Sequence, residues 1–192
     1  RRFRKPCNPF FRADHLAQFM APFVQAEATR LIEAFAGHGE AELRAVFAAP
    51  LALHVVMHIV GIPAEKAAQI RRWYDDFSLA LANYTGNAAV LAKGLRSAGE
   101  FRNILQPSLE EGLVSEESLL GALIRAPRAL TRAEIESNAL IMLFGGIETT
   151  ESMILNALWA LLTHPEALEA IRRDQSLLIN AIEESLRWEP AV

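Results

Sequence analysis

The sequence predicts an all-α protein, and three features of the chain lead to this prediction. Apolar residues recur every three or four positions over most of its 192 residues, as they do on the buried face of a helix. Helix start and stop signals separate these stretches, and no useful length of chain alternates apolar with polar residues as a half-buried strand does. The length is enough for one domain with a sizeable core, so we expect residues 1–192 to form a single domain.

Several predicted helices precede the longest one, and each has its own signals. The Gly-His-Gly triplet at residues 37–39 is expected to end the first helix. Pro63 is compatible with the first turn of the helix predicted from residue 64. Ser115, followed by two glutamates, is expected to cap a short helix with an acidic first turn. In chain order, the longer predicted helices cover residues 13–36, 41–60, 64–84 and 87–106.

The longest predicted helix runs from Thr131 to just before Pro165. Thr131 and Glu134 match the capping-box pattern at its start, and a proline is a usual stop at its end. A helix of this length spans about 50 Å at 1.5 Å per residue. Its apolar residues cover most of the circumference, so we expect it to be buried. Two further helices are expected over residues 166–174 and 177–190.

Composition and charge argue against several classes of protein. A formal net charge of −4 gives no reason to expect nucleic acid or an anionic membrane as a partner. The longest apolar run, residues 139–147, is far shorter than the roughly 18 residues of a membrane span, and the basic N-terminus lacks the apolar region of a signal peptide. Cys7 is the single cysteine, so no internal disulfide is possible, and a reducing, cytoplasmic location is expected.

Both ends of the chain have the features of a cut sequence. The chain starts without a methionine, inside a basic segment, and it stops at residues 187–192, directly after a helical pattern. We therefore expect it to be part of a longer protein. Any function predicted from these residues concerns that parent protein.

An unusual hexapeptide, Gly-Gly-Ile-Glu-Thr-Thr at residues 145–150, interrupts the longest helix. Each glycine in a helix interior costs about 1 kcal/mol relative to alanine, but together they leave a surface against which a flat molecule could lie. Glu148 next to Thr149 is an acid–alcohol pair of the kind that delivers protons. We therefore expect the helix to open locally beside a cavity. The plainer alternative is that the glycines allow close helix packing and that Glu148 and Thr149 face solvent.

This hexapeptide resembles the central-helix motif of cytochrome P450, the haem-thiolate monooxygenases, whose pattern is Ala/Gly-Gly-x-Asp/Glu-Thr-Thr/Ser. Glu184-x-x-Arg187 resembles a second motif of the family and follows at a suitable distance. The N-terminal segment is similar to the family's C helix, where Arg4 matches an arginine that holds a haem propionate. The resemblance covers the whole chain, from the C helix to the K helix. It implies the central helical part of the mainly α cytochrome P450 fold, of bacterial type.

The resemblance also implies roles for single residues. Glu148 is expected to relay protons from solvent, and Thr149 to hydrogen-bond the bound dioxygen and its water, so these two are the expected catalytic residues. The resemblance places the haem beside Arg4, Gly145, Gly146 and Thr149, and a hydrophobic substrate beside Ile141, Phe144 and Gly145. Glu184 and Arg187 are expected to form a buried ion pair with a structural role, in which Glu183 is a competing partner for the arginine.

One part of the family pattern is not found in these 192 residues. The iron ligand of the family is a cysteine in a Phe-x-x-Gly-x-x-x-Cys loop, which we expect downstream of Val192. Cys7 lies in no such context and is interpreted as a small apolar residue that is buried or half-buried. No metal site is therefore expected within the chain itself, and haem (iron protoporphyrin IX) is expected to be absent from it or weakly held.

The partners implied by the resemblance are a hydrophobic small-molecule substrate, O2 and a ferredoxin-like or flavodoxin-like electron donor. The parent protein is expected to be a monomer. A basic cluster formed by Arg1, Arg2, Arg4, Lys5 and Arg12 is a candidate docking surface for an acidic electron donor. A solvated charged face is an equally good interpretation of the same cluster.

Three other interpretations stay open. His54 and His58 have the spacing of a zinc-binding pair, but the glutamate of the zinc-protease motif and a third ligand are missing. A haem-free, P450-like helical binding module would also fit the missing ligand loop. An all-α ligand-sensing regulator can have this length, but it needs a basic helix-turn-helix, and Pro6 and Pro9 interrupt the basic N-terminal segment.

Overall fold

The computed structural model describes residues 4–111, 115, 117–126 and 130–191, and within these residues the chain is helical, without a β-strand. The prediction of an all-α fold is therefore confirmed. The chain divides into two compact units, which are described separately. The first comprises Arg1–Glu27 and Leu53–Gly145, and the second comprises Ala28–Ala52 and Gly146–Val192. The expectation of a single domain stays a prediction.

Short helical segments form the N-terminal part of the first unit. They are α1 (Arg4–Cys7), a 3-10 turn (Asn8–Phe11), α2 (Ala13–His15) and a π turn (Leu16–Met20), and they lead into α3 (Ala21–Phe35). The predicted helix over residues 13–36 is thus confirmed in extent. The π turn within it was not predicted, because apolar spacing does not resolve one extra residue in a helical turn.

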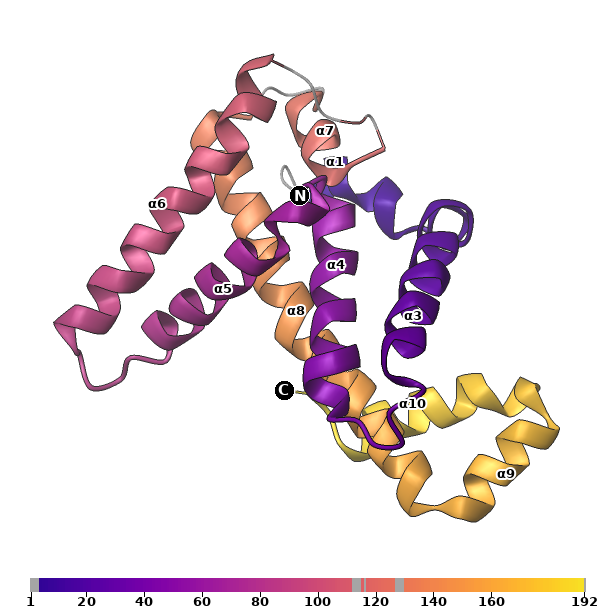
Figure 1. Ribbon diagram of the computed structural model, residues 1–192. Helices are drawn as coiled ribbons and strands as arrows, with labels where there is room; N and C mark the ends of the chain where they lie inside the picture. The colour runs from indigo at the N-terminus through magenta and orange to yellow at the C-terminus, as the bar shows by residue number, and fades with distance from the viewer. Residues whose placement is uncertain (1–3, 112–114, 116, 127–129, 192) are drawn as a thin grey trace. The chain divides into compact units, whose positions relative to one another are not determined.

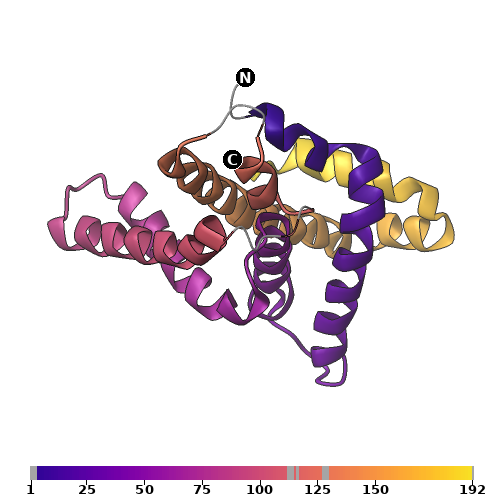
Figure 2. The ribbon, with the colours of Figure 1, turned by 90° about the horizontal axis from the view of Figure 1, so that it is seen from above.

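Two long antiparallel helices, α5 (Ala67–Leu81) and α6 (Ala88–Glu111), make up much of the first unit. They lie side by side in Figures 1 and 2. Buried aromatic side chains join them, because the ring of Phe101 meets Trp73 and Phe77 edge to face, at centroid distances of 6.3 and 6.4 Å. The sequence predicted both helices from their apolar periodicity, and the structure confirms them.

The C-terminal end of α6 differs from the prediction. We expected this helix to end at residue 106, before Pro107, but it continues to Glu111 with Pro107 inside it. Proline removes one backbone donor, so the carbonyl group of Asn103 loses its helical partner. Asn103 and Pro107 are both exposed, so water can satisfy that carbonyl group and the helix tolerates the proline.

The short helix α7 (Leu119–Ile124) has a different N-cap from the predicted one. Ser118, and not Ser115, caps it, since its hydroxyl oxygen accepts a hydrogen bond of 3.1 Å from the backbone N–H of Gly121. The hydroxyl of Ser115 instead accepts from the backbone N–H of Glu117, so this acidic residue precedes the helix. Glu116, the other expected residue of the acidic first turn, lies outside the described residues.

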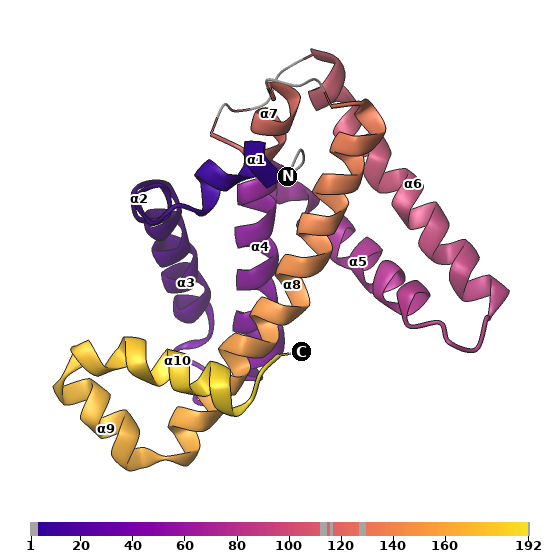
Figure 3. The same cartoon turned by 180° about the vertical axis from the view of Figure 1, so that it is seen from behind.

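The second unit is built around the C-terminal part of α8 (Arg132–Thr163), followed by α9 (Pro165–Arg173) and α10 (Leu178–Trp188). Pro165 occupies the first turn of α9, so this helix begins one residue before the predicted start at Glu166. Figure 3 shows α10 turning back toward α8, and the side-chain amide of Asn156 donates to the backbone carbonyl of Glu189 at 2.8 Å. Parts of α3 and α4 (Ala49–Val60) and a π turn (Arg44–Ala48) complete this unit.

Candidate functional site

The candidate site is built on α8, which is anchored at its start by the predicted capping box. The backbone N–H of Glu134 donates to the hydroxyl of Thr131 at 3.3 Å, and the backbone N–H of Thr131 donates to the Glu134 carboxylate at 2.7 Å. From there α8 continues for 32 residues, so both its start and its length agree with the prediction.

The helix does not open at the hexapeptide, and this part of the prediction is wrong. Residues 145–150 are regular α-helix, whereas the π turns of the described chain lie at Leu16–Met20 and Arg44–Ala48. Leu143 and Ile147 have 0% exposure and lie one turn apart, on either side of the glycine pair. Their packing holds the backbone in the helix although glycine lowers its intrinsic stability.

One face of α8 is exposed and apolar, which corrects the expectation that this helix is buried all round. Ile141 and Phe144 are 66% and 37% exposed, although they lie in the middle of a mainly apolar helix. Gly145 and Glu148 are also exposed and follow at helical spacing, so the four residues share one face. We call Ile141, Phe144, Gly145 and Glu148 the open face of α8.

The glycines differ in their surroundings. A Cβ atom placed on Gly145 would meet no atom within 4 Å, so the backbone there borders open space. Gly146 is half-buried. Gly145 therefore provides the bare helix surface that the sequence suggested, and a flat ligand could approach the backbone there.

The two predicted catalytic side chains lie on neighbouring sides of α8. Glu148 is exposed, Thr149 is half-buried and Thr150 is exposed again. An acid that reaches water beside an alcohol shielded from it is suited to passing protons inward. Phe144, one turn before Glu148, is held by a ring contact with the buried Tyr74 of α5, at a centroid distance of 5.9 Å.

A buried carboxylate, which the sequence analysis missed, lies one turn after Glu148. The side chain of Glu151 is 4% exposed and forms a hydrogen-bonded ion pair with the guanidinium Nε of Arg44. This pair, together with the nearby charges of Glu42 and Glu148, raises the pKa of Arg44. The sequence contained no signal for it, because Arg44 and Glu151 are 107 residues apart and each alone resembles an ordinary surface charge.

The Glu184–Arg187 pair is present, but it is not buried. Arg187 donates to both carboxylate oxygens of Glu184, at 2.8 Å from Nε and 2.5 Å from an Nη atom. The two side chains are 65% and 62% exposed, which corrects the expectation of a buried pair. The hydrogen bonds from Arg187, with its charge, lower the pKa of Glu184. The structural role of the pair stays a prediction.

The N-terminal candidates lie on α1. Arg4 is exposed on α1 and accessible to a ligand, and Lys5 is exposed beside it. Cys7 is half-buried, as predicted, and burial raises the pKa of its thiol. Cys7 lies in no Phe-x-x-Gly-x-x-x-Cys context, so its sequence surroundings do not mark it as the haem ligand.

His54 and His58 have separate partners. His54 Nδ1 lies 2.5 Å from a carboxylate oxygen of Glu27, whereas the ring of His58 stacks on Phe23 at a centroid distance of 3.8 Å. Partial burial lowers the pKa of His58. Among the described residues no three metal-binding side chains come together, and these contacts favour ordinary packing over a zinc pair.

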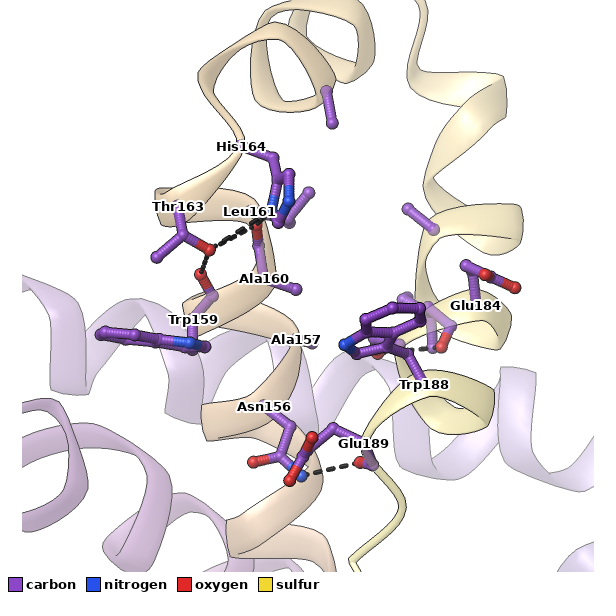
Figure 4. Close-up of a pocket in the computed structure, with 14 residues that line it drawn as sticks. Asn156, Ala157, Trp159, Ala160, Leu161, Thr163, His164, Glu184, Trp188 and Glu189 are labelled. Atoms are coloured by element: carbon purple, nitrogen blue, oxygen red, sulfur yellow. Dashed lines mark hydrogen bonds between the residues drawn. The ribbon is translucent and has the colours of Figure 1, made fainter.

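A groove in the second unit was also missed by the sequence analysis. It has a volume of about 540 Å³ and lies between α8, α9 and α10. Figure 4 shows Trp159 on α8 and Trp188 on α10, with Asn156 hydrogen-bonded to Glu189 nearby. The two indole side chains are 72% and 73% exposed, and the amphipathic pattern of their helices did not indicate this.

Comparison with known proteins supports the family resemblance. The family model of cytochrome P450 matches residues 101–191. The C-19 steroid 1alpha-hydroxylase of Sorangium cellulosum is 32% identical over 194 residues, covering 99% of this chain and 49% of that protein. The monooxygenase PikC of Streptomyces venezuelae is 33% identical over 190 residues, covering 91% of this chain and 42% of that protein. The crystal structure of CalO2 matches with a TM-score of 0.90 and 29% identity, covering 98% of this chain and 48% of that one.

The chain therefore belongs to the cytochrome P450 family. It spans about half the length of the curated relatives it matches. Within the described residues, no helix combines the length and the apolar character that crossing a membrane requires.

Proposed function

We propose that the chain is the central helical part of a haem-dependent monooxygenase. This enzyme inserts one oxygen atom from O2 into a hydrophobic small molecule, with electrons from a redox partner. The observation that carries the proposal is the open face of α8, where apolar side chains, a bare glycine backbone and an acid are exposed together on one face of the helix. Exposed apolar surface of this kind is typical of a ligand-binding site.

The residues of the open face fit one side of a haem. Gly145 leaves room for a flat ring, and Ile141 and Phe144 offer apolar surface beside it. When bound, haem supplies the iron chemistry by which O2 is reduced and one of its oxygen atoms is transferred. Cys7, the single cysteine of the chain, lies outside the Phe-x-x-Gly-x-x-x-Cys pattern that holds the thiolate in the family, so we assign the iron ligand to a residue that is not among these 192.

The side chains of α8 would divide the remaining tasks. Ile141 and Phe144 contact the substrate and exclude water from it. The hydroxyl of Thr149 donates a hydrogen bond to dioxygen and holds a water molecule beside it. The carboxylate of Glu148 takes protons from solvent and passes them to that water. Arg4 on α1 would pair with a haem propionate, as an exposed guanidinium can.

The alternative functions have less support. A haem-free binding module and a ligand-sensing regulator both lack a counterpart among the relatives reported above, which are named as a hydroxylase and a monooxygenase. A cytoplasmic location, a monomeric parent protein and a ferredoxin-like or flavodoxin-like donor stay predictions.

The carbon monoxide difference spectrum of the reduced parent protein tests the proposal directly. We expect the spectrum of a thiolate-ligated haem, and a coding sequence that continues beyond Val192 with a Phe-x-x-Gly-x-x-x-Cys pattern. A parent protein that binds no haem would contradict the proposal and favour the binding module.

Thr149→Ala tests the assigned chemistry. In the parent protein, loss of the hydroxyl should divert turnover from product to peroxide, because protons no longer reach dioxygen in order. The measurement compares oxygen consumed, product formed and peroxide released. Thr150→Ala is the matched control, since Thr150 is the same residue type one position further on and is exposed. Equal coupling in the two variants would argue against the role of Thr149.

A further inference from the structure

Large apolar side chains are exposed along one side of α10. Ile179, Ile182 and Leu186 follow one another at intervals of three and four residues, so they share that side, and Leu178 lies one turn before Ile182. All four are exposed, and Ile179 is 71% exposed. We call Leu178, Ile179, Ile182 and Leu186 the apolar side of α10. Exposed apolar surface of this kind marks interfaces in soluble proteins.

The groove between α8, α9 and α10 continues this surface, since Ile182 belongs to both. In Figure 4 the indole ring of Trp188 extends from α10 toward α8, near Ala157. This side chain is nevertheless 73% exposed. Tryptophan is among the residues that contribute most to protein interfaces when they become fully desolvated. Trp188 is therefore suited to anchor a segment that fills the groove.

Within the part of the chain that the structure describes, α9 and α10 have almost no core of their own. No side chain of α9 is buried, and Ser185 is the single buried residue of α10. Helices of 9 and 11 residues are marginal in water by themselves and owe most of their stability to the packing of an apolar face. A partner that came and went would leave this packing incomplete for much of the time, so the surface needs a permanent cover.

The relatives indicate where a permanent cover would come from. The chain covers 48% of the CalO2 structure and 49% of the steroid 1alpha-hydroxylase. In both proteins about half of the polypeptide therefore lies outside the matched region. A segment of the same polypeptide stays close to the surface at a high effective concentration, which a separate protein does not.

We propose that the groove and the apolar side of α10 form an interface within the parent protein, anchored by Trp188 and covered by an apolar segment from the half of the fold outside these 192 residues. This inference rests on the proposed function, because it takes the chain to be part of a longer P450. The competing occupants are a second copy of the parent protein and a separate protein. Both would leave the surface exposed in the monomeric parent.

Hydroxyl-radical footprinting of the parent protein, read out by mass spectrometry, tests the proposal at Trp188. Trp73 is the internal control, because it is the same residue type and is 1% exposed. An anchor that is fully desolvated should be oxidised slowly, so we expect a rate for Trp188 within about twofold of the rate for Trp73. The same rates should be found at every protein concentration.

Each other outcome overturns the proposal. Oxidation of Trp188 about tenfold faster than that of Trp73 would show that the groove is open in the parent protein and available to a separate partner. Protection of Trp188 that increases with protein concentration would assign the surface to a second copy. A parent protein without further chain to supply the cover would also contradict the proposal.

Two variants one residue apart give a second measurement in the parent protein. Ile179→Glu places a charge on the apolar side of α10, and Asn180→Glu places the same charge on its exposed, polar side. We expect Ile179→Glu to lower the melting temperature by about 5 °C or more, because burying an unpaired carboxylate is costly. Asn180→Glu should shift it by less than about 1 °C. Equal shifts in the two variants would argue against a covered surface.

The footprint needs neither haem nor turnover, so its failure is distinguishable from a failure of the proposed function. A parent protein that protects Trp188 but lacks the spectrum of a thiolate-ligated haem would contradict the proposed function and keep this inference. A parent protein that has the spectrum but leaves Trp188 open to oxidation would keep the proposed function and overturn this inference.

Discussion

Asp76 is a buried charge whose partners the structure identifies. Its side chain is 6% exposed on α5, and it accepts a hydrogen bond of 2.6 Å from the Ser97 hydroxyl and pairs with Lys93 Nζ at 2.8 Å. Burial acts to raise the pKa of Asp76, but the bonds from Lys93 and Ser97 outweigh it, so the net pKa lies below the ordinary value. The folded state therefore favours the ionised carboxylate.

Asp76→Asn should reduce stability in a pH-dependent way. Because the folded-state pKa is depressed, the stabilisation is fully present above the unfolded pKa of about 3.9 and is lost as the pH falls through the folded-state value. We expect a loss of about 1–3 kcal/mol in the free energy of unfolding at pH 7. The difference in unfolding free energy between this variant and the unsubstituted chain should shrink below about pH 4. Urea unfolding at several pH values measures it.

Asp75→Asn is the matched control for this prediction. Asp75 directly precedes Asp76 in the chain, is 53% exposed and pairs with Arg71 on the surface. Exposed pairs contribute little, so we expect almost no change at any pH. An effect of Asp76→Asn that does not depend on pH would contradict an electrostatic origin.

At the same scale, the sequence identified candidates by residue type and spacing. It found Glu148, Thr149 and the glycine pair because those residues are unusual inside an apolar helix. It could not find Glu151, since that glutamate becomes unusual only through burial against Arg44, which comes from a distant segment. Burial of a single side chain depends on its neighbours in space, which spacing along the chain does not specify.

At the scale of elements, one glycine sets how closely α5 and α6 approach. A Cβ atom on Gly94 would lie 2.4 Å from the Cβ of Ala80 and 3.2 Å from the backbone oxygen of Asp76. Neither neighbour is the end of a flexible side chain, so the helices would have to separate. Gly99 lies on the same helix, and a Cβ there would meet nothing within 4 Å.

These two glycines provide a matched pair of alanine variants. Gly94→Ala should lower the free energy of unfolding by up to about 2 kcal/mol, because overpacking costs about 1–3 kcal/mol and better helix propensity returns about 1 kcal/mol. Gly99→Ala should raise it by up to about 1 kcal/mol, because only the propensity changes. Thermal unfolding of the two variants gives both values. A change in unfolding free energy of the same sign in both variants would show that the close approach at Gly94 does not determine how α5 and α6 pack.

Helix signals predicted most elements, and their failures have local causes. The capping box at Thr131 and Glu134 was predicted correctly because it depends on residues three positions apart. The N-cap of α7 was assigned to Ser115, and not to Ser118, because two serines near a helix start satisfy the same pattern. Only the hydrogen bonds of the folded backbone distinguish them.

At the scale of the whole molecule, the net charge is negative, but basic residues are clustered near the N-terminus. The net charge of −4 offers no general attraction for an acidic electron donor, so docking would depend on the basic N-terminal cluster. Of this cluster, Arg1 and Arg2 lie outside the described residues, Arg4 and Lys5 are exposed, and the Nε of Arg12 is paired with Asp14 at 3.2 Å. Within this cluster, Arg4 and Lys5 are therefore the described residues best placed to attract an anionic partner.

Lys5→Glu tests docking in the parent protein. We expect the rate of reduction by an acidic donor to fall about tenfold at low salt. At 1 M salt, where charges act over only about 3 Å, the variant and the unsubstituted protein should be reduced at the same rate. Stopped-flow reduction over a range of salt concentrations measures this. Lys66→Glu, which makes the same charge change on another segment, should have a much smaller effect. A reduction rate that does not depend on salt would favour the solvated-face interpretation.

The sequence by itself determined the helical class, the extent of most helices and the family, because each depends on patterns within a few turns of chain or on motifs in a fixed order. The tertiary structure decided which sides of those helices are exposed. It showed α8 as an unbroken helix with an open face, the Glu184–Arg187 pair on the surface, and a buried glutamate bonded to Arg44. These features depend on which side chains exclude water from one another, and only the folded chain brings those side chains together.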